Sequence, residues 1–172
     1  MKTIEQHLGQ YAQYHRDQRN ILTHYAGIPL IVFSLLCLLS RPVFGTANLL
    51  LIGDLLLSPA LVVWIVGNVF YFKLDLRFGI VMALLTGALL YVAQAVALSS
   101  TAVWLLLSIG IFVGGWVLQF IGHYYEGKKP AFVDDLMGLA IGPLFVVAEV
   151  AFELGLRPEL KQSVEAVAGP VH

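Results

Sequence analysis

Three histidines, His15, His24 and His123, stand at the polar ends of long apolar segments. Imidazole nitrogens bind transition metals and exchange protons near neutral pH, so these side chains are the first candidates for chemistry. Three imidazoles, with or without a carboxylate, are suitable ligands for Fe(II), Zn(II) or Mn(II). The single cysteine, Cys37, lies within a leucine run, so a zinc cage built from thiolates is not expected. The residue types therefore favour a histidine-based metal site, with packing at a membrane interface as the alternative.

Two polar residues near these histidines are candidates for catalytic roles. Glu126 follows His123 by three residues, so on a helix both side chains project from the same face. Asn20 stands between His15 and His24. Glu126 is either a carboxylate of the site or a solvated loop residue.

The composition indicates that a bilayer surrounds most of the chain. Of its 172 residues, 59% are hydrophobic and 12% are charged, and the mean hydropathy is +0.83. Soluble domains usually contain about 25% charged residues. The net charge is −1, so the chain has no basic field that would attract nucleic acid, and nucleic-acid binding is not expected.

The apolar segments predict an all-α fold, a polytopic membrane bundle of about five membrane helices behind an N-terminal amphipathic helix. The amphipathic helix is expected over 3–18, where apolar residues recur at helical spacing. Membrane helices are expected over 24–40, 55–72, 78–98 and 102–122. The last apolar run, 136–152, has a proline inside it and is expected either to cross the membrane or to fold back as a re-entrant or broken helix. Residues 46–57 are predicted to form a half-helix or an interfacial element.

We expect these elements to form one membrane domain over 1–172. Within it, 1–24 is the interfacial helix with the first metal-ligand segment, 25–155 is the membrane bundle, and 156–172 is a mobile tail. The sequence leaves the oligomeric state open.

The basic residues predict how the bundle is oriented. Lysine and arginine prefer the cytoplasmic side of short loops. The predicted spans put three basic pairs on one side of the membrane: Arg16 and Arg19, Lys73 and Arg77, and Lys128 and Lys129. The same spans bring the three histidines to that side. We therefore expect an integral, multi-pass protein of a bacterial cytoplasmic membrane or the endoplasmic reticulum, with its metal site at the cytoplasmic face.

Three short motifs occur in the order found in a known family. The first is Tyr14-His15-Arg16 with Asn20, His24 and Gly27-Ile28-Pro29; the second is Gln119-Phe120-Ile121-Gly122-His123 with Glu126 and Pro130-Ala131; the third is Gly142-Pro143 followed by Glu149. Over roughly residues 3–155, the chain resembles the membrane 2-hydroxy-fatty-acid dioxygenases, a family long described as a domain of unknown function.

The resemblance implies an Fe²⁺-dependent α-oxidation at the membrane interface. A 2-hydroxy fatty acid and O₂ would give the fatty acid one carbon shorter, while the acyl tail stays in membrane lipid. The implied iron ligands are His15, His24 and His123. Since a guanidinium can bind a carboxylate with two hydrogen bonds, basic residues are candidates for binding the substrate. These candidates are Arg16, Arg19 and Lys128.

Other functions remain open from the residues alone. A di-iron hydroxylase or desaturase needs paired histidine clusters, and the chain has only five histidines in all. A transporter would place charged residues deep in its membrane spans, and only Glu149 and Asp54 fit that description. A transporter would also show inverted repeats. A non-enzymatic membrane protein that binds or transports lipid would use its histidines only for packing. That alternative predicts that alanine substitutions at the histidines leave function intact.

Overall fold

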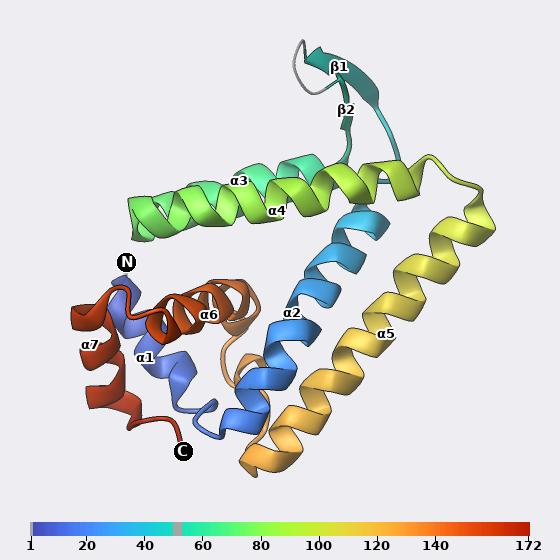
Figure 1. Ribbon diagram of the computed structural model, residues 1–172. Coiled ribbons are helices and arrows are strands. Elements are labelled where there is room, and N and C mark those ends of the chain that lie inside the picture. Colours follow the sequence, from blue (N-terminus) through green and yellow to red (C-terminus); the bar gives the residue numbers. More distant parts are fainter. Residues whose placement is uncertain (1, 50–52) are drawn as a thin grey trace. The chain divides into compact units, whose positions relative to one another are not determined.

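The computed structural model describes residues 2–49 and 53–172, which are mainly helical (Figure 1). The predicted all-α fold of a membrane helix bundle is confirmed. The elements are α1 (Ile4–Ala12), α2 (Gln18–Leu39), β1 (Gly45–Leu49), β2 (Gly53–Leu57), α3 (Pro59–Leu74), α4 (Leu76–Ala97), α5 (Thr101–Glu126), the 3₁₀ helix η1 (Ala131–Val133), α6 (Gly138–Glu153) and α7 (Pro158–Ala168).

The chain divides into two compact units. The first, which we call the histidine unit, contains the chain up to Pro29 together with Gly115–His172. The second, which we call the hairpin unit, contains Leu30–Gly114. Helices α2 and α5 each contribute residues to both units.

Helix α1 of the histidine unit begins with a capping box. The Thr3 hydroxyl accepts a hydrogen bond from the Gln6 N–H, and the Gln6 side chain accepts one from the Thr3 N–H. The helix packs against α6 and α7, and a methyl group on Gly9 would lie 3.2 Å from Cβ of Val167 in α7. Helix α1 ends at Ala12 rather than near residue 18, which leaves a short loop before α2.

Helix α2 begins earlier than the sequence predicted. Oδ1 of Asp17 accepts a hydrogen bond from the Arg19 N–H at 2.8 Å, the usual arrangement of an aspartate N-cap. The helix therefore starts at Gln18, and Pro29 lies inside it instead of in its first turn. As a result, His24 lies well within the helix.

In the histidine unit, α2 and α5 approach each other closely at two glycines. A methyl group on Gly122 of α5 would overlap the side chains of Thr23 and Asn20 in α2. A methyl group on Gly27 of α2 would overlap the Gln119 amide in α5. Small residues allow membrane helices to approach at short distance, and here they bring the helices that carry His24 and His123 together.

The hairpin unit contains a two-stranded antiparallel sheet that the sequence did not predict. Strands β1 and β2 pair Thr46 with Leu56, so the prediction of a half-helix over 46–57 is wrong; residues 50–52 lie outside the described part of the chain. The Gln94 side chain in α4 fixes the hairpin, because it accepts a hydrogen bond from the Leu56 N–H and donates one to the Leu56 carbonyl, both at 3.0 Å.

Helices α3 and α4 lie side by side in this unit (Figure 1). They pack with the second half of α2 around a core of small and apolar side chains: Leu36, Cys37, Ala60, Leu90 and Ala93. The hairpin takes up the start of the span predicted over 55–72, so α3 begins only at Pro59.

Within residues 2–49 and 53–172, three helices are long and apolar enough to cross a membrane: α2, α4 and α5. A fourth span results if α6 and α7, which meet at a bend of 117°, are counted together, whereas α3 has only 16 residues. Residues 158–168, in the segment for which the sequence predicted a mobile tail, form α7 against α1. Among the described residues, the structure thus provides three or four long spans, where the sequence predicted about five membrane helices.

Candidate metal centre

The structure brings His15, His24 and His123 together in the histidine unit. One comes from the loop after α1, one from α2 and one from the end of α5. All three side chains are buried, and each offers a ligand nitrogen within 4.8 Å of the other two. The closest pair is Nε2 of His15 and Nε2 of His24, which are 3.1 Å apart.

The backbone fixes the tautomers of two of these imidazoles. Nδ1 of His15 lies 2.9 Å from the Tyr11 carbonyl, and Nδ1 of His24 lies 2.9 Å from the Asn20 carbonyl. A carbonyl only accepts hydrogen bonds, so each Nδ1 carries the proton and each neutral ring has a bare Nε2. Burial, together with the neighbouring His24, holds the pKa of His15 well below its usual value, which keeps this ring neutral.

The facing nitrogens fit a bound cation. Two bare Nε2 atoms at 3.1 Å cannot hydrogen-bond to each other, because both present lone pairs. A metal ion between them removes this conflict, and imidazole nitrogens bind such ions at about 2.0–2.1 Å. The nitrogen of His123 provides a third donor to the same place.

Aromatic contacts hold the ring of His15 in place. The Tyr11 ring stacks on it with a centroid distance of 4.2 Å and an interplanar angle of 4°. Phe145 of α6 lies against both rings, at centroid distances of 5.0 Å from Tyr11 and 5.3 Å from His15. Sequence reasoning did not assign either residue to the site. The spacing of one helical turn between Tyr11 and His15 could have indicated that the two rings are in contact. Phe145 is distant from both in sequence, so no sequence pattern indicated its contact.

Glu126, a predicted catalytic residue, is hydrogen-bonded to the loop that carries His15. Its carboxylate accepts from the Arg16 N–H at 3.0 Å, from the Asp17 N–H at 2.9 Å and from the Asn20 amide at 3.0 Å. Among the described residues, the group of mutually close metal donors consists of the three histidines and does not include Glu126. The carboxylate therefore joins the end of α5, next to His123, to the start of α2.

Asn20, the other predicted catalytic residue, also makes contacts that position the site. Its side-chain amide donates to the Tyr14 carbonyl at 3.1 Å and to Glu126. Its own carbonyl accepts the proton of His24. The residue thus connects the loop, the carboxylate and the second histidine.

Arg16, predicted to bind substrate, is only 4% exposed. Its Nη2 lies 2.9 Å from Oε1 of Glu149 in α6, and its Nε donates to the carbonyls of Ala12 and His15 at 3.0 and 2.7 Å. Nη1 donates to the Gly169 carbonyl at 3.2 Å. The ionisable group that the sequence placed deep in an apolar run, Glu149, thus has an arginine as its partner.

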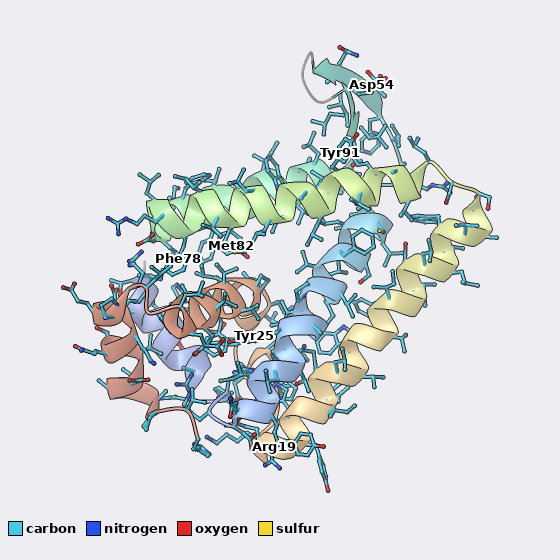
Figure 2. The ribbon with its side chains drawn as sticks, viewed as in Figure 1. Arg19, Tyr25, Asp54, Phe78, Met82 and Tyr91 are labelled. Carbon is cyan, nitrogen blue, oxygen red and sulfur yellow. The ribbon has the colours of Figure 1, made fainter. Side chains whose placement is uncertain are left out.

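The other two predicted substrate-binding cations are exposed. The Arg19 guanidinium pairs with Asp17 at 2.7 Å, lowering the pKa of that carboxyl to about 2, and lies over the Tyr125 ring at 4.6 Å from its centroid. Figure 2 shows Arg19 at the start of α2, beside the end of α5. Nζ of Lys128 donates to the Gln13 carbonyl at 2.7 Å. Both cations therefore lie at the polar edge of the histidine unit.

Comparison with known proteins relates this arrangement to an enzyme family. A family model described as 2-hydroxy-palmitic acid dioxygenase Mpo1-like matches residues 1–154. The chain is 34% identical over 167 residues to the 2-hydroxy-palmitic acid dioxygenase MPO1 of Saccharomyces cerevisiae, with 94% of this chain and 87% of the yeast protein covered. No solved structure gives a significant match. The family match includes all three histidines of the cluster and the buried Glu149.

Proposed function

Because the chain belongs to the Mpo1-like family of 2-hydroxy-palmitic acid dioxygenases, we propose that it oxidises 2-hydroxy fatty acids with O₂. The balanced reaction converts R–CH(OH)–COOH and O₂ into R–COOH, CO₂ and H₂O. The bond between the carboxyl carbon and the hydroxyl-bearing carbon breaks, and O₂ takes up four electrons. The observation that supports this proposal best is the buried cluster of three imidazoles, two of which face each other with bare nitrogens.

The metal that we propose for this cluster is Fe²⁺, held by His15, His24 and His123. Bound Fe²⁺ would supply redox chemistry toward O₂ and, with three protein ligands, open positions for the hydroxyl and carboxylate oxygens of the substrate. Burial keeps the His15 imidazole neutral. The carbonyls of Tyr11 and Asn20 orient the rings of His15 and His24, while the low exposure of the rings keeps bulk water away.

We assign Glu126 and Asn20 to positioning the ligands rather than to contact with substrate. The hydrogen bonds of Glu126 hold the loop of His15 against the end of α5, where His123 lies. Metal-binding histidines depend on such surrounding hydrogen bonds for orientation and affinity.

The substrate would approach from the side where Arg19 and Lys128 are exposed, and we propose that these cations attract its carboxylate. A hollow lined by apolar and aromatic side chains runs along α5 to the same place: Val117, Phe120, Ile121, Tyr124 and Tyr125. Arg19 lies over Tyr125 at one end of this hollow. A cation at the end of an apolar surface suits a fatty acid, whose chain would lie along α5 in lipid. By the distribution of basic residues, we place this side at the cytoplasmic face of the membrane.

The experiment that tests this function uses protein purified anaerobically in detergent and loaded with Fe²⁺. It is given 2-hydroxypalmitate and O₂, and the products are measured by mass spectrometry. We expect pentadecanoate and CO₂ from the wild type, and loss of both with His123→Ala or a chelator. His172→Ala is the matched control, because that exposed side chain is not part of the cluster.

Two results would contradict the proposal in different ways. Stoichiometric iron without product from a range of 2-hydroxy acids would retain the metal site but exclude this substrate class. Absence of bound iron together with absence of product would favour the non-enzymatic alternative, in which the histidines serve only for packing.

A further inference from the structure

The peptide group between His15 and Arg16 is held at both of its polar atoms. Its carbonyl oxygen, which belongs to His15, accepts from Nε of Arg16 at 2.7 Å. Its N–H, which belongs to Arg16, donates to the Glu126 carboxylate at 3.0 Å. A peptide plane fixed in this way cannot rotate without breaking a hydrogen bond, so the direction in which the His15 side chain leaves the backbone is fixed as well.

The Arg16 guanidinium connects this peptide group to three other parts of the histidine unit. It reaches Ala12 at the end of α1, Glu149 in α6 and Gly169 after α7. The segment after α7 is tied to the same loop through its backbone: the His172 N–H donates to the Arg16 carbonyl, and the Gln18 N–H donates to the His172 carbonyl, both at 3.0 Å.

The ion pair between Arg16 and Glu149 requires an explanation other than stability. Its side chains are 5% and 8% exposed, so both charges have lost most of their hydration. Burying such a pair often contributes no more to stability than apolar residues of similar volume would. What a buried guanidinium provides, and an apolar side chain lacks, is a rigid set of N–H donors with defined directions. Here those donors point to the carbonyl of a proposed metal ligand and to the segments around it.

We propose that Arg16 and Glu149 form a positioning pair that sets His15 for metal binding. Glu149 holds the guanidinium from α6, and the guanidinium holds the His15 carbonyl. Arg16 therefore acts on the reaction through a ligand and does not bind the substrate carboxylate. This inference rests on the proposed metal site, and metal affinity tests it independently of turnover.

The first experiment measures Co²⁺ affinity of the full-length protein in detergent, by calorimetry and by the visible absorption of bound Co²⁺. Arg16→Lys keeps the charge next to Glu149 but loses the fork of donors. We expect it to weaken Co²⁺ binding by about tenfold or more, the usual range for residues that orient metal ligands. Glu149→Asp, which keeps the charge but shortens the reach to Arg16, is expected to weaken binding less and serves as the second variant if Arg16→Lys does not fold.

Arg41→Lys is the matched control. Arg41 lies in the hairpin unit, where it also donates to backbone carbonyls, those of Ala97 and Ser99, and lies over the Trp104 ring. We expect this variant to bind Co²⁺ as the wild type does. Circular dichroism and size exclusion would establish that each variant is folded.

The second readout separates positioning from substrate binding. With metal at saturating concentration, a positioning role predicts that Arg16→Lys retains the wild-type KM for 2-hydroxypalmitate. A raised KM with unchanged Co²⁺ affinity would instead make Arg16 a substrate-binding residue and overturn the proposal. Wild-type Co²⁺ affinity in both folded variants would overturn it too. If the wild type itself binds no metal, it is the proposed function that fails.

Discussion

His15 and His24 are oriented in the same way: each donates its Nδ1 proton to the carbonyl four residues earlier, and the two Nε2 atoms then face each other at 3.1 Å. The local backbone thus dictates which nitrogen of each ring is free. This arrangement leaves two lone pairs in close opposition in a buried place, and a cation is the simplest partner for both.

Metal should therefore stabilise the folded protein through these nitrogens. At a free Co²⁺ or Fe²⁺ concentration of about 100 times Kd, binding adds about 2.7 kcal/mol to the free energy of unfolding. We expect thermal unfolding in detergent to shift upward with metal in the wild type and to remain unchanged in His24→Ala. Reversal of the shift by a chelator is the accompanying control. An equal shift in His24→Ala would show that the metal binds elsewhere.

Glu126→Gln should weaken the site without removing a ligand. The Glu126 carboxylate accepts hydrogen bonds from two backbone N–H groups and from the Asn20 side-chain amide. A glutamine side chain has a single acceptor oxygen, because its amide nitrogen is a donor, so it cannot accept all three bonds equally well. We expect a loss of about 1–3 kcal/mol in stability and at least tenfold lower metal affinity. Denaturant unfolding and Co²⁺ titration check this, with Glu159→Gln on the exposed surface of α7 as the control.

Gly122→Ala should separate α2 from α5 near the histidines. The added methyl group would overlap the Thr23 and Asn20 side chains, and overpacking of this kind costs about 1–3 kcal/mol. Both unfolding and Co²⁺ titration should report the change, since Asn20 also orients His24. Gly110→Ala, in the same helix, is the control because its methyl group would meet no described atom within 4 Å. Equal behaviour of the two variants would contradict the role assigned to Gly122.

Arg19→Gln should affect substrate capture but not the metal. The attraction between an exposed cation and an anionic substrate is screened by salt, with a screening length of about 10 Å at 0.1 M ionic strength. We expect a KM for 2-hydroxypalmitate several-fold higher at low salt, a smaller difference at high salt, and unchanged Co²⁺ affinity. Lys73→Gln, in the last turn of α3, is the control. A KM equal to the wild-type value at low salt would remove Arg19 from the substrate path.

The elements that sequence analysis predicted well are those with a local cause. Helices α4 and α5 lie close to the uncharged runs over 78–98 and 102–122, since length and apolarity alone determine such helices. The three histidines could be predicted as candidate metal ligands because imidazole binds metals and because all three stand at the ends of apolar segments, which the sequence alone reveals. The start of α2 was missed because an aspartate cap, rather than Pro29, determines it.

Features with distant partners could not be predicted in this way. Strand β2 is hydrogen-bonded to Gln94, which follows Leu56 by 38 residues. Arg16 was predicted to bind substrate, and its contact with Glu149, which lies 133 residues away in the chain, could not be foreseen. An arginine next to a candidate metal ligand looks the same in sequence whether it faces outward to a substrate or inward to a carboxylate.

The long separation between Arg16 and its partners also orders events during synthesis. The loop with His15 leaves the ribosome before Glu126 and Glu149, which follow Arg16 by 110 and 133 residues. Until α5 and α6 have been made, the Arg16 N–H lacks its acceptor, Glu126. The guanidinium that donates to the His15 carbonyl likewise lacks its partner, Glu149. If the cluster binds metal as proposed, the nascent chain would complete the metal-binding geometry late, and metal capture would follow the synthesis of most of the protein.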